Sequence, residues 1–257
     1  MKADGILVCA ALLLSIGAAC GGAPTSPRTP QPSQSSGGTR QSEHFEFVYT
    51  ALDTSNIGEI ASDLEREYAR IVTDLGVQSM PRVRVRLYPD QAALAAALAP
   101  VIGPVPAWVS GAATRADEIH LISPNHPAFA PYSRMISNLV HEFAHCVSLQ
   151  VNPRIANNPR WFWESVAIFE ARQFVDPTTL DYMTAGRPPS LASLNSLENT
   201  AIYQVGYTIG EFIAGRGGPG ALRDLVANHA DVSRTLGLTE DAFEREWLAF
   251  VRGRYGI

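Results

Sequence analysis

Residues 141–145 read His-Glu-Phe-Ala-His, inside a longer stretch with helical periodicity that begins near Ser133. Apolar residues recur through this stretch at spacings of three and four, as one buried face of a helix requires: Ile136, Leu139, Val140, Phe143 and Val147. On a helix, His141 and His145 lie one turn apart, about 40° apart in projection, so both imidazoles can reach one ion. The stretch therefore predicts a buried helix that carries two metal ligands.

Glu142 lies at the edge of the same helical face. Its carboxylate can reach a water at the metal without ligating the ion, which is the place of a general base. With 6 His in 257 residues, such a pattern is expected by chance roughly 0.008 times per chain. Coincidence is thus a poor explanation of the pattern. A purely structural role for these residues is also a poor explanation, because a charged Glu in an apolar helix needs a partner.

A catalytic zinc usually takes three protein ligands and keeps a fourth position for water, so a further ligand must come from elsewhere in the chain. After Asn158-Pro159, a favourable helix start, the segment from Trp161 to Gln173 is predicted as a second, largely apolar helix. Its two acids, Glu164 and Glu170, are six residues apart and point to different sides of that helix.

These two helices together resemble those of the gluzincin zinc metallopeptidases, including their smaller, peptidase MA-like bacterial relatives. The resemblance implies a zincin-like domain in which His141, His145 and Glu164 bind Zn²⁺ and Glu142 is the general base for hydrolysis of peptide bonds. Many relatives carry Gly after the ligand Glu, where this chain has Ser165. Glu170 is expected to be an exposed acid, or one that supports the site from behind.

Tyr203-Gln204-Val205-Gly206 is similar to the Tyr-x-x-Gly segment of aminopeptidase-N-like enzymes. In those enzymes the tyrosine hydroxyl donates a hydrogen bond to the developing oxyanion. The resemblance implies that Tyr203 is a second catalytic residue, which shares with zinc the charge on the carbonyl oxygen. A core tyrosine is the alternative interpretation, and Tyr207, one turn further on, is the substitute candidate.

The function predicted from these residues is zinc-dependent hydrolysis of a peptide or protein substrate. The alternative is a catalytically idle, zincin-fold binding protein of the cell envelope, which keeps the fold and binds without turnover. The intact Glu142 favours the enzyme, because a binding protein has no chemical need for that acid.

Residues 1–20 are predicted to be a lipoprotein-type signal peptide. Ile6 to Ala19 is an uncharged apolar run of 14 residues, short for a transmembrane helix. The small residues before Cys20 resemble the lipobox of bacterial lipoproteins, so Cys20 would carry a lipid anchor to the membrane. Residues 21–42, rich in Pro, Gly and Ser, are predicted to be a disordered tether. The expected location is therefore outside the cytoplasm at the cell envelope, with a secreted protein as the alternative.

The folded domain is predicted to span 43–257. Alternating residues predict strands at 44–49 and 82–88, and two short segments, 107–110 and 118–122, are interpreted as further strands. Helical patterns cover 57–75, 91–98 and most of the chain after Ser133. Strands first and helices later predict an α+β domain with a small N-terminal sheet and a mainly helical second half.

The composition of the chain limits the classes of partner and of cross-link that can be expected. A net charge of −5 without a dense Lys/Arg run provides no cationic surface for nucleic acid, so no nucleic-acid partner is expected. Cys146 is the one cysteine of the predicted domain, so no intramolecular disulfide is expected there, and its thiol is predicted to pack in the core. His120 is expected to be a half-exposed strand residue and not a fourth ligand.

Overall fold

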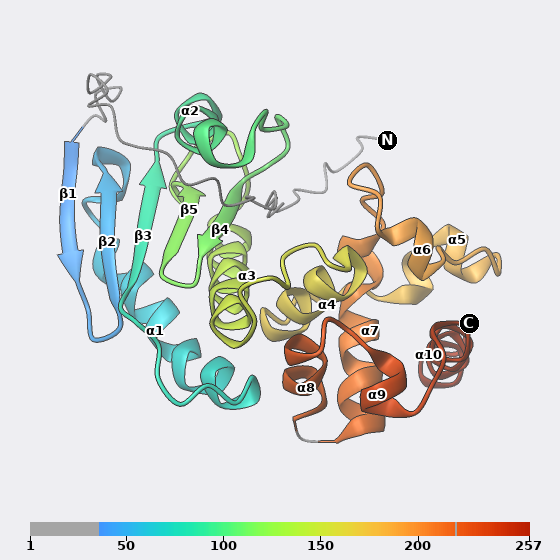
Figure 1. Ribbon diagram of the computed structural model, residues 1–257. Coiled ribbons are helices and arrows are strands. Elements are labelled where there is room, and N and C mark those ends of the chain that lie inside the picture. The colour runs from blue at the N-terminus through green and yellow to red at the C-terminus, as the bar shows by residue number, and fades with distance from the viewer. Residues whose placement is uncertain (1–35, 219) are drawn as a thin grey trace, which may run out of the picture.

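The computed structural model describes residues 36–218 and 220–257 (Figure 1). A five-stranded sheet lies in the N-terminal half of this part, and the chain from Tyr132 onward is mainly helical. The predicted α+β class is thereby confirmed. The predicted signal peptide, Cys20 and residues 21–35 of the predicted tether lie outside the described residues.

The sheet has the strand order β1-β2-β3-β5-β4. Its three central strands, β2, β3 and β5, are parallel, and the two edge strands pair antiparallel with their neighbours. Alternate side chains of β2 and β3 are buried, as the sequence pattern predicts. The strands span Ser36–Gln41 (β1), Phe45–Thr50 (β2), Val83–Tyr88 (β3), Gly111–Arg115 (β4) and Glu118–Ile122 (β5).

Strand β1 corrects the predicted boundary between tether and domain. Residues 36–41 were predicted to be tether, but they pair with β2, with Arg40 opposite Phe47. An edge strand can be held by main-chain hydrogen bonds alone, so its side chains need not be apolar. Gly37 suits this place, because a Cβ there would collide with the carbonyl oxygen of Thr50. The folded part therefore includes Ser36 and does not begin at Glu43.

A second correction concerns the strand predicted at 107–110. The strand β4 instead occupies Gly111–Arg115, and residues 107 and 108 form a turn. The sequence of β4, Gly-Ala-Ala-Thr-Arg, contains few of the β-branched or aromatic residues that mark strands. Pairing with β5 and packing on the helix beneath therefore decide its conformation.

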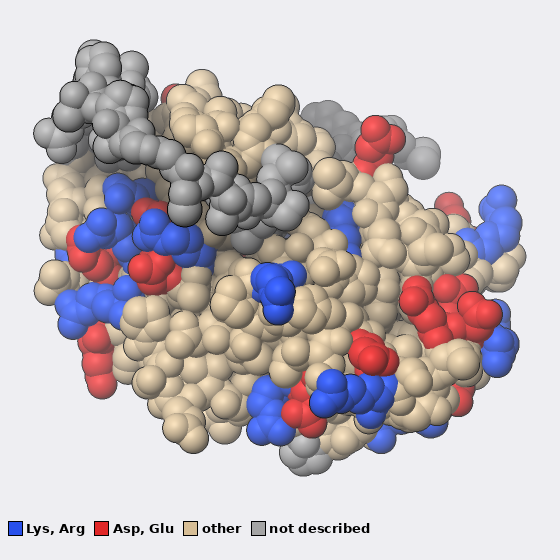
Figure 2. Space-filling view, in the orientation of Figure 1, with Lys and Arg blue, Asp and Glu red and all other residues tan. Residues whose placement is uncertain are grey.

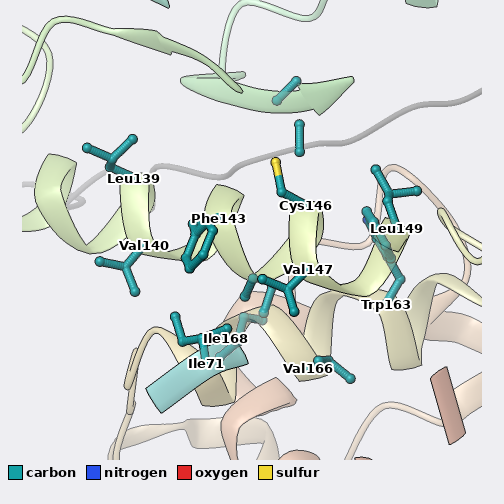
Figure 3. Close-up of a cluster of buried hydrophobic side chains, with 14 of the residues drawn as sticks. Ile71, Leu139, Val140, Phe143, Cys146, Val147, Leu149, Trp163, Val166 and Ile168 are labelled. Atoms are coloured by element: carbon teal, nitrogen blue, oxygen red, sulfur yellow. The ribbon is translucent and has the colours of Figure 1, made fainter. Parts of the chain in front are cut away.

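Helices α1 (Ile57–Asp74) and α3 (Tyr132–Val151) pack against the sheet, and α2 (Gln91–Ile102) connects β3 to the segment before β4. The aromatic rings of Phe45 and Phe143, from β2 and α3, lie 5.2 Å apart. Figure 3 shows Val147 of α3 pointing toward the other helices, where Ile71 and Ile168 lie, and Cys146 pointing the opposite way, toward the sheet. The helix α3 is therefore buried on both sides.

The helical half is arranged around α4 (Arg160–Glu170) and α7 (Ile202–Gly217). Two glycines of α7 allow close packing, because a Cβ on Gly206 would lie 2.7 Å from Ile168 Cδ1 and one on Gly210 would lie 2.5 Å from Phe169 Cβ. The remaining helical segments are η1 (Ala51–Asp53), η2 (Pro177–Thr179), α5 (Asp181–Thr184), α6 (Leu191–Leu194), α8 (Ala221–Ala227), α9 (Val232–Leu236) and α10 (Glu240–Tyr255).

Charged side chains on the surface are intermixed. Figure 2 shows basic and acidic residues side by side over the sheet. Two arginines of β3 are paired with carboxylates: Arg84 with Glu46 at 3.2 Å and Arg86 with Glu118 at 2.8 Å. Over the described ranges, no helix combines the length and the apolar character that crossing a membrane requires.

Candidate metal centre

His141 and His145 of α3 meet Glu164 where α3 packs against α4. One ligand atom from each side chain lies within 4.8 Å of the other two. Glu164 Oε2 lies 3.3 Å from His141 Nε2 and 3.9 Å from His145 Nε2. The structure therefore brings together the three residues predicted to bind the metal, although Glu164 lies 19 residues after His145.

The packing of α3 and α4 leaves these rings little freedom. The indole ring of Trp163 stacks on the imidazole of His145, with centroids 3.9 Å apart and planes inclined by 9°. The imidazole of His141 stands at 88° to that of His145, with centroids 4.6 Å apart. Because Trp163 precedes Glu164 in α4, one turn of this helix supplies both a ligand and a support for another ligand.

The facing atoms of the three side chains fit a metal ion. All three residues are at most 1% exposed. Within the described part of the chain, His141 Nε2, His145 Nε2 and both Glu164 oxygens have no hydrogen-bond partner. Unsatisfied buried polar atoms are costly, and a divalent cation would satisfy all of them at once. Two imidazoles and one carboxylate are also the donor set of many catalytic zinc sites.

The two histidines differ in electrostatic environment. Burial, with a smaller effect of His141, holds the pKa of His145 well below its ordinary value. Burial also acts to lower the pKa of His141, but Glu164 and, less strongly, Glu142 and Gln173 together outweigh burial and raise that pKa. The lowered pKa of His145 favours its neutral form, which is the form that metal ligation requires.

Glu142 is the residue after the ligand His141, but its side chain has different neighbours from those of the ligands. It is fully buried, and it faces the first residue of β4: a Cβ on Gly111 would lie 3.3 Å from Glu142 Cγ. The Glu142 side chain therefore reaches the beginning of the edge strand, and it is not one of the three grouped ligand side chains.

Tyr203 and Tyr207 lie in different surroundings. Tyr203 lines a pocket of about 410 Å³ together with His141, and the guanidinium of Arg160 donates a hydrogen bond to its hydroxyl at 3.3 Å. The ring of Tyr207 instead packs against Phe169 and Phe174, at 5.3 and 5.2 Å. Of the two candidates, it is Tyr203 that shares a pocket with a predicted metal ligand.

Glu170 is not an exposed acid, because its side chain is fully buried. Its carboxylate accepts a hydrogen bond from Arg70 at 2.6 Å, and Arg70 also donates to the backbone oxygen of Glu170. Burial raises the pKa of Glu170 to about 7 in spite of Arg70. Glu170 lies outside the group of three ligand side chains, so its place is beside α1.

His120 is buried and not half-exposed, which corrects a further expectation. Its Nδ1 lies 2.8 Å from the hydroxyl of Tyr88, and burial lowers its pKa to about 4. It does not belong to the group of ligand side chains either. Cys146 is a buried free thiol, as predicted, and burial raises its pKa well above the ordinary value.

One polar contact of the site was not predicted from the sequence. The side-chain oxygen of Gln173, three residues past the end of α4, lies 2.9 Å from His141 Nδ1. The sequence carries no local signal for this contact, because it depends on how the chain turns after α4.

Among the described residues, three or more His, Cys, Asp or Glu side chains lie close enough to share a metal ion in one place only, at His141, His145 and Glu164. Scans of the chain against protein-family models, curated proteins and solved structures found no match.

Proposed function

We propose that this protein is a zinc-dependent peptidase of the gluzincin type, with Glu142 as its general base. The observation that carries the proposal is the meeting of His141, His145 and Glu164 in the core, with their facing atoms lacking hydrogen-bond partners among the described residues. Glu142 is adjacent to one of these ligands in α3.

Zinc held by the three side chains would supply Lewis-acid chemistry and lower the pKa of water at its open position to about 7. The Glu142 carboxylate then removes a proton as the water oxygen bonds to the carbonyl carbon of the peptide. As the carbon–nitrogen bond breaks, Glu142 delivers that proton to the leaving amine. The Tyr203 hydroxyl donates a hydrogen bond to the carbonyl oxygen, where negative charge develops.

The edge strand β4 is a suitable place for an extended substrate. Among the described residues, β4 is the last strand on its side of the sheet, and it pairs with β5 on its other side. A peptide beside β4 can use main-chain hydrogen bonds, which do not depend on its sequence. Gly111 places the beginning of this strand against Glu142. The pocket beside His141 and Tyr203 offers space for a substrate side chain.

The test begins with zinc content and cleavage of a peptide library by the full chain, with and without a chelator. We predict that Glu142→Gln lowers kcat/KM by about 10²–10⁴-fold with zinc content unchanged, because the variant cannot accept a proton. Undiminished hydrolysis would exclude Glu142 as the base.

Glu170→Gln is the matched control, since it makes the same change in a buried acid outside the group of ligands. It should retain hydrolysis at neutral pH. If the wild-type chain binds zinc stoichiometrically but cleaves no peptide of the library, the protein is the catalytically idle binding protein and not the enzyme.

A further inference from the structure

A chain of hydrogen bonds connects His141 to the beginning of the edge strand. The Gln173 oxygen lies 2.9 Å from His141 Nδ1, and the Gln173 amide nitrogen donates to Asn138 Oδ1 at 3.0 Å. Asn138 in turn donates to the hydroxyl of Ser110 at 3.3 Å. Asn138 and Ser110 are buried. The contact to His141 is therefore the end of an ordered polar network and not an isolated surface pair.

This direction of hydrogen bonding selects one form of the His141 ring. An amide oxygen can only accept a hydrogen bond, so His141 Nδ1 must carry the proton. In the neutral ring, which is the form that binds a metal, the lone pair is then on Nε2, the nitrogen that faces Glu164 at 3.3 Å. Asn138 Oδ1 accepts from the Gln173 amide nitrogen, which leaves the Gln173 oxygen facing His141 Nδ1. A metal ligand needs this tautomer and this ring orientation.

The backbone places Gln173 by a tight reversal at the end of α4. Arg172 has φ +53, in the left-handed region. The Arg172 amide donates to the Phe169 carbonyl and the Gln173 amide to the Ile168 carbonyl, both at 3.0 Å, which is the Schellman pattern. The reversal directs Gln173 back toward α3. One helix and its terminal turn thus supply the ligand Glu164 and the partner of the ligand His141.

We infer that Gln173 is a positioning residue of the metal centre, which holds His141 in the tautomer and orientation that bind the ion. The inference rests on the metal centre of the proposed function, but it concerns metal affinity and not hydrolysis. Loss of a comparable partner of a histidine ligand costs about 10–100-fold in metal affinity.

The test measures the zinc affinity of the full chain by competition with a chromogenic chelator. Gln173→Ala should bind zinc about 10–100-fold more weakly than wild type. Gln173→Glu should bind at least as tightly as wild type, because a carboxylate accepts the same hydrogen bond and the Asn138 amide can turn to donate to its second oxygen. Gln204→Ala, which alters another glutamine of the same pocket, should leave the affinity unchanged.

The two substitutions of Gln173 separate positioning from structural disturbance, because only positioning predicts opposite results for Ala and Glu. Equal affinity of Gln173→Ala and wild type would overturn the inference, as would equal weakening by Ala and Glu. Zinc binding without any peptide cleavage would refute the proposed peptidase activity and leave the role of Gln173 intact. A wild-type chain that binds no zinc would overturn both.

Discussion

At the scale of single residues, Arg160 determines the surroundings of Tyr203. Its guanidinium is buried, and it donates to the carbonyl oxygens of Leu194, Ser196 and Asn199 as well as to the Tyr203 hydroxyl. The guanidinium carbon also lies 5.4 Å from the centre of the Tyr203 ring. A hydroxyl that accepts a hydrogen bond from a cation is itself a stronger hydrogen-bond donor. Arg160 therefore favours the donor role proposed for Tyr203.

We predict that Tyr203→Phe lowers kcat by about 10²–10³-fold, because one donor to the developing oxyanion is lost. The zinc content should stay at the wild-type level, since Tyr203 is not a ligand. The kcat of each variant is measured on the best peptide of the library. Tyr207→Phe is the matched control, because Tyr207 does not line the pocket that contains His141. Equal losses in the two variants would argue against the assignment.

The buried acid Glu170 predicts a dependence of stability on pH. Its pKa rises from an ordinary 4.5 to about 7 in the folded protein, chiefly through burial. Between these values the folded state holds a proton that the unfolded state has released, so this contribution to stability is lost as the pH rises from about 4.5 through about 7. Glu170→Gln cannot titrate and should lack this contribution.

Urea unfolding of metal-free protein at pH 5 and pH 8 measures the effect. The fall in the free energy of unfolding between the two pH values should be smaller in Glu170→Gln than in wild type, because the other titrating groups are common to both. An equal fall in both proteins would show that Glu170 titrates normally.

At the scale of elements, the position of Glu164 depends on how closely α4 packs against α7. Gly210 faces Phe169, and a Cβ there would lie 2.5 Å from the Cβ of that residue. The neighbouring atom is close to the backbone of α4 and cannot move aside by itself. The two helices must therefore separate if Gly210 is enlarged.

We predict that Gly210→Ala lowers the free energy of unfolding by about 1–3 kcal/mol, the usual effect of overpacking. Zinc affinity should fall as well, because α4 carries Glu164. Gly215→Ala is the matched control in the same helix: nothing lies within 4 Å of its Cβ position, so the better helix propensity of Ala should raise stability by up to about 1 kcal/mol. Urea unfolding and chelator competition check both variants, and an unchanged Gly210→Ala would contradict the packing argument.

At the scale of the whole molecule, the centre lies where the helix that packs on the sheet meets the other helices. The helix α3, packed beneath the sheet, contributes His141 and His145, and the helical half contributes Glu164 and Tyr203 (Figure 1). We propose that this domain is held at the cell envelope by lipid on Cys20. The support is the apolar run of 14 residues that precedes Cys20.

We predict that Cys20→Ser moves the protein from the membrane fraction to the soluble fraction of a bacterial host, and that mass spectrometry finds a lipid-modified N-terminal peptide only in the wild type. Zinc binding should be equal in both, because Cys20 is not in the domain that holds the ligands. A soluble, unmodified wild-type protein found outside the cell would instead favour a secreted enzyme.

Much of the α+β fold could be predicted because its signals are local. Helix α1 was predicted from periodicity within a residue of its end, where Gly76 has φ +64. Strands β1 and β4 could not be located in this way, because their Gly- and Ala-rich sequences are ordered by hydrogen bonds to β2 and β5. The burial of His120 was missed for a related reason, since its partner Tyr88 lies on another strand.

The sequence by itself determined that His141 and His145 share one helical face with Glu142 at its edge, because the spacing of side chains on a helix depends only on positions along the chain. Only the tertiary structure decided that Glu164 meets the two histidines, that Glu170 pairs with Arg70 and that Gln173 orients His141. Those contacts depend on how separate helices pack and where the chain turns between them. Packing of this kind has no period in the sequence from which it could be predicted.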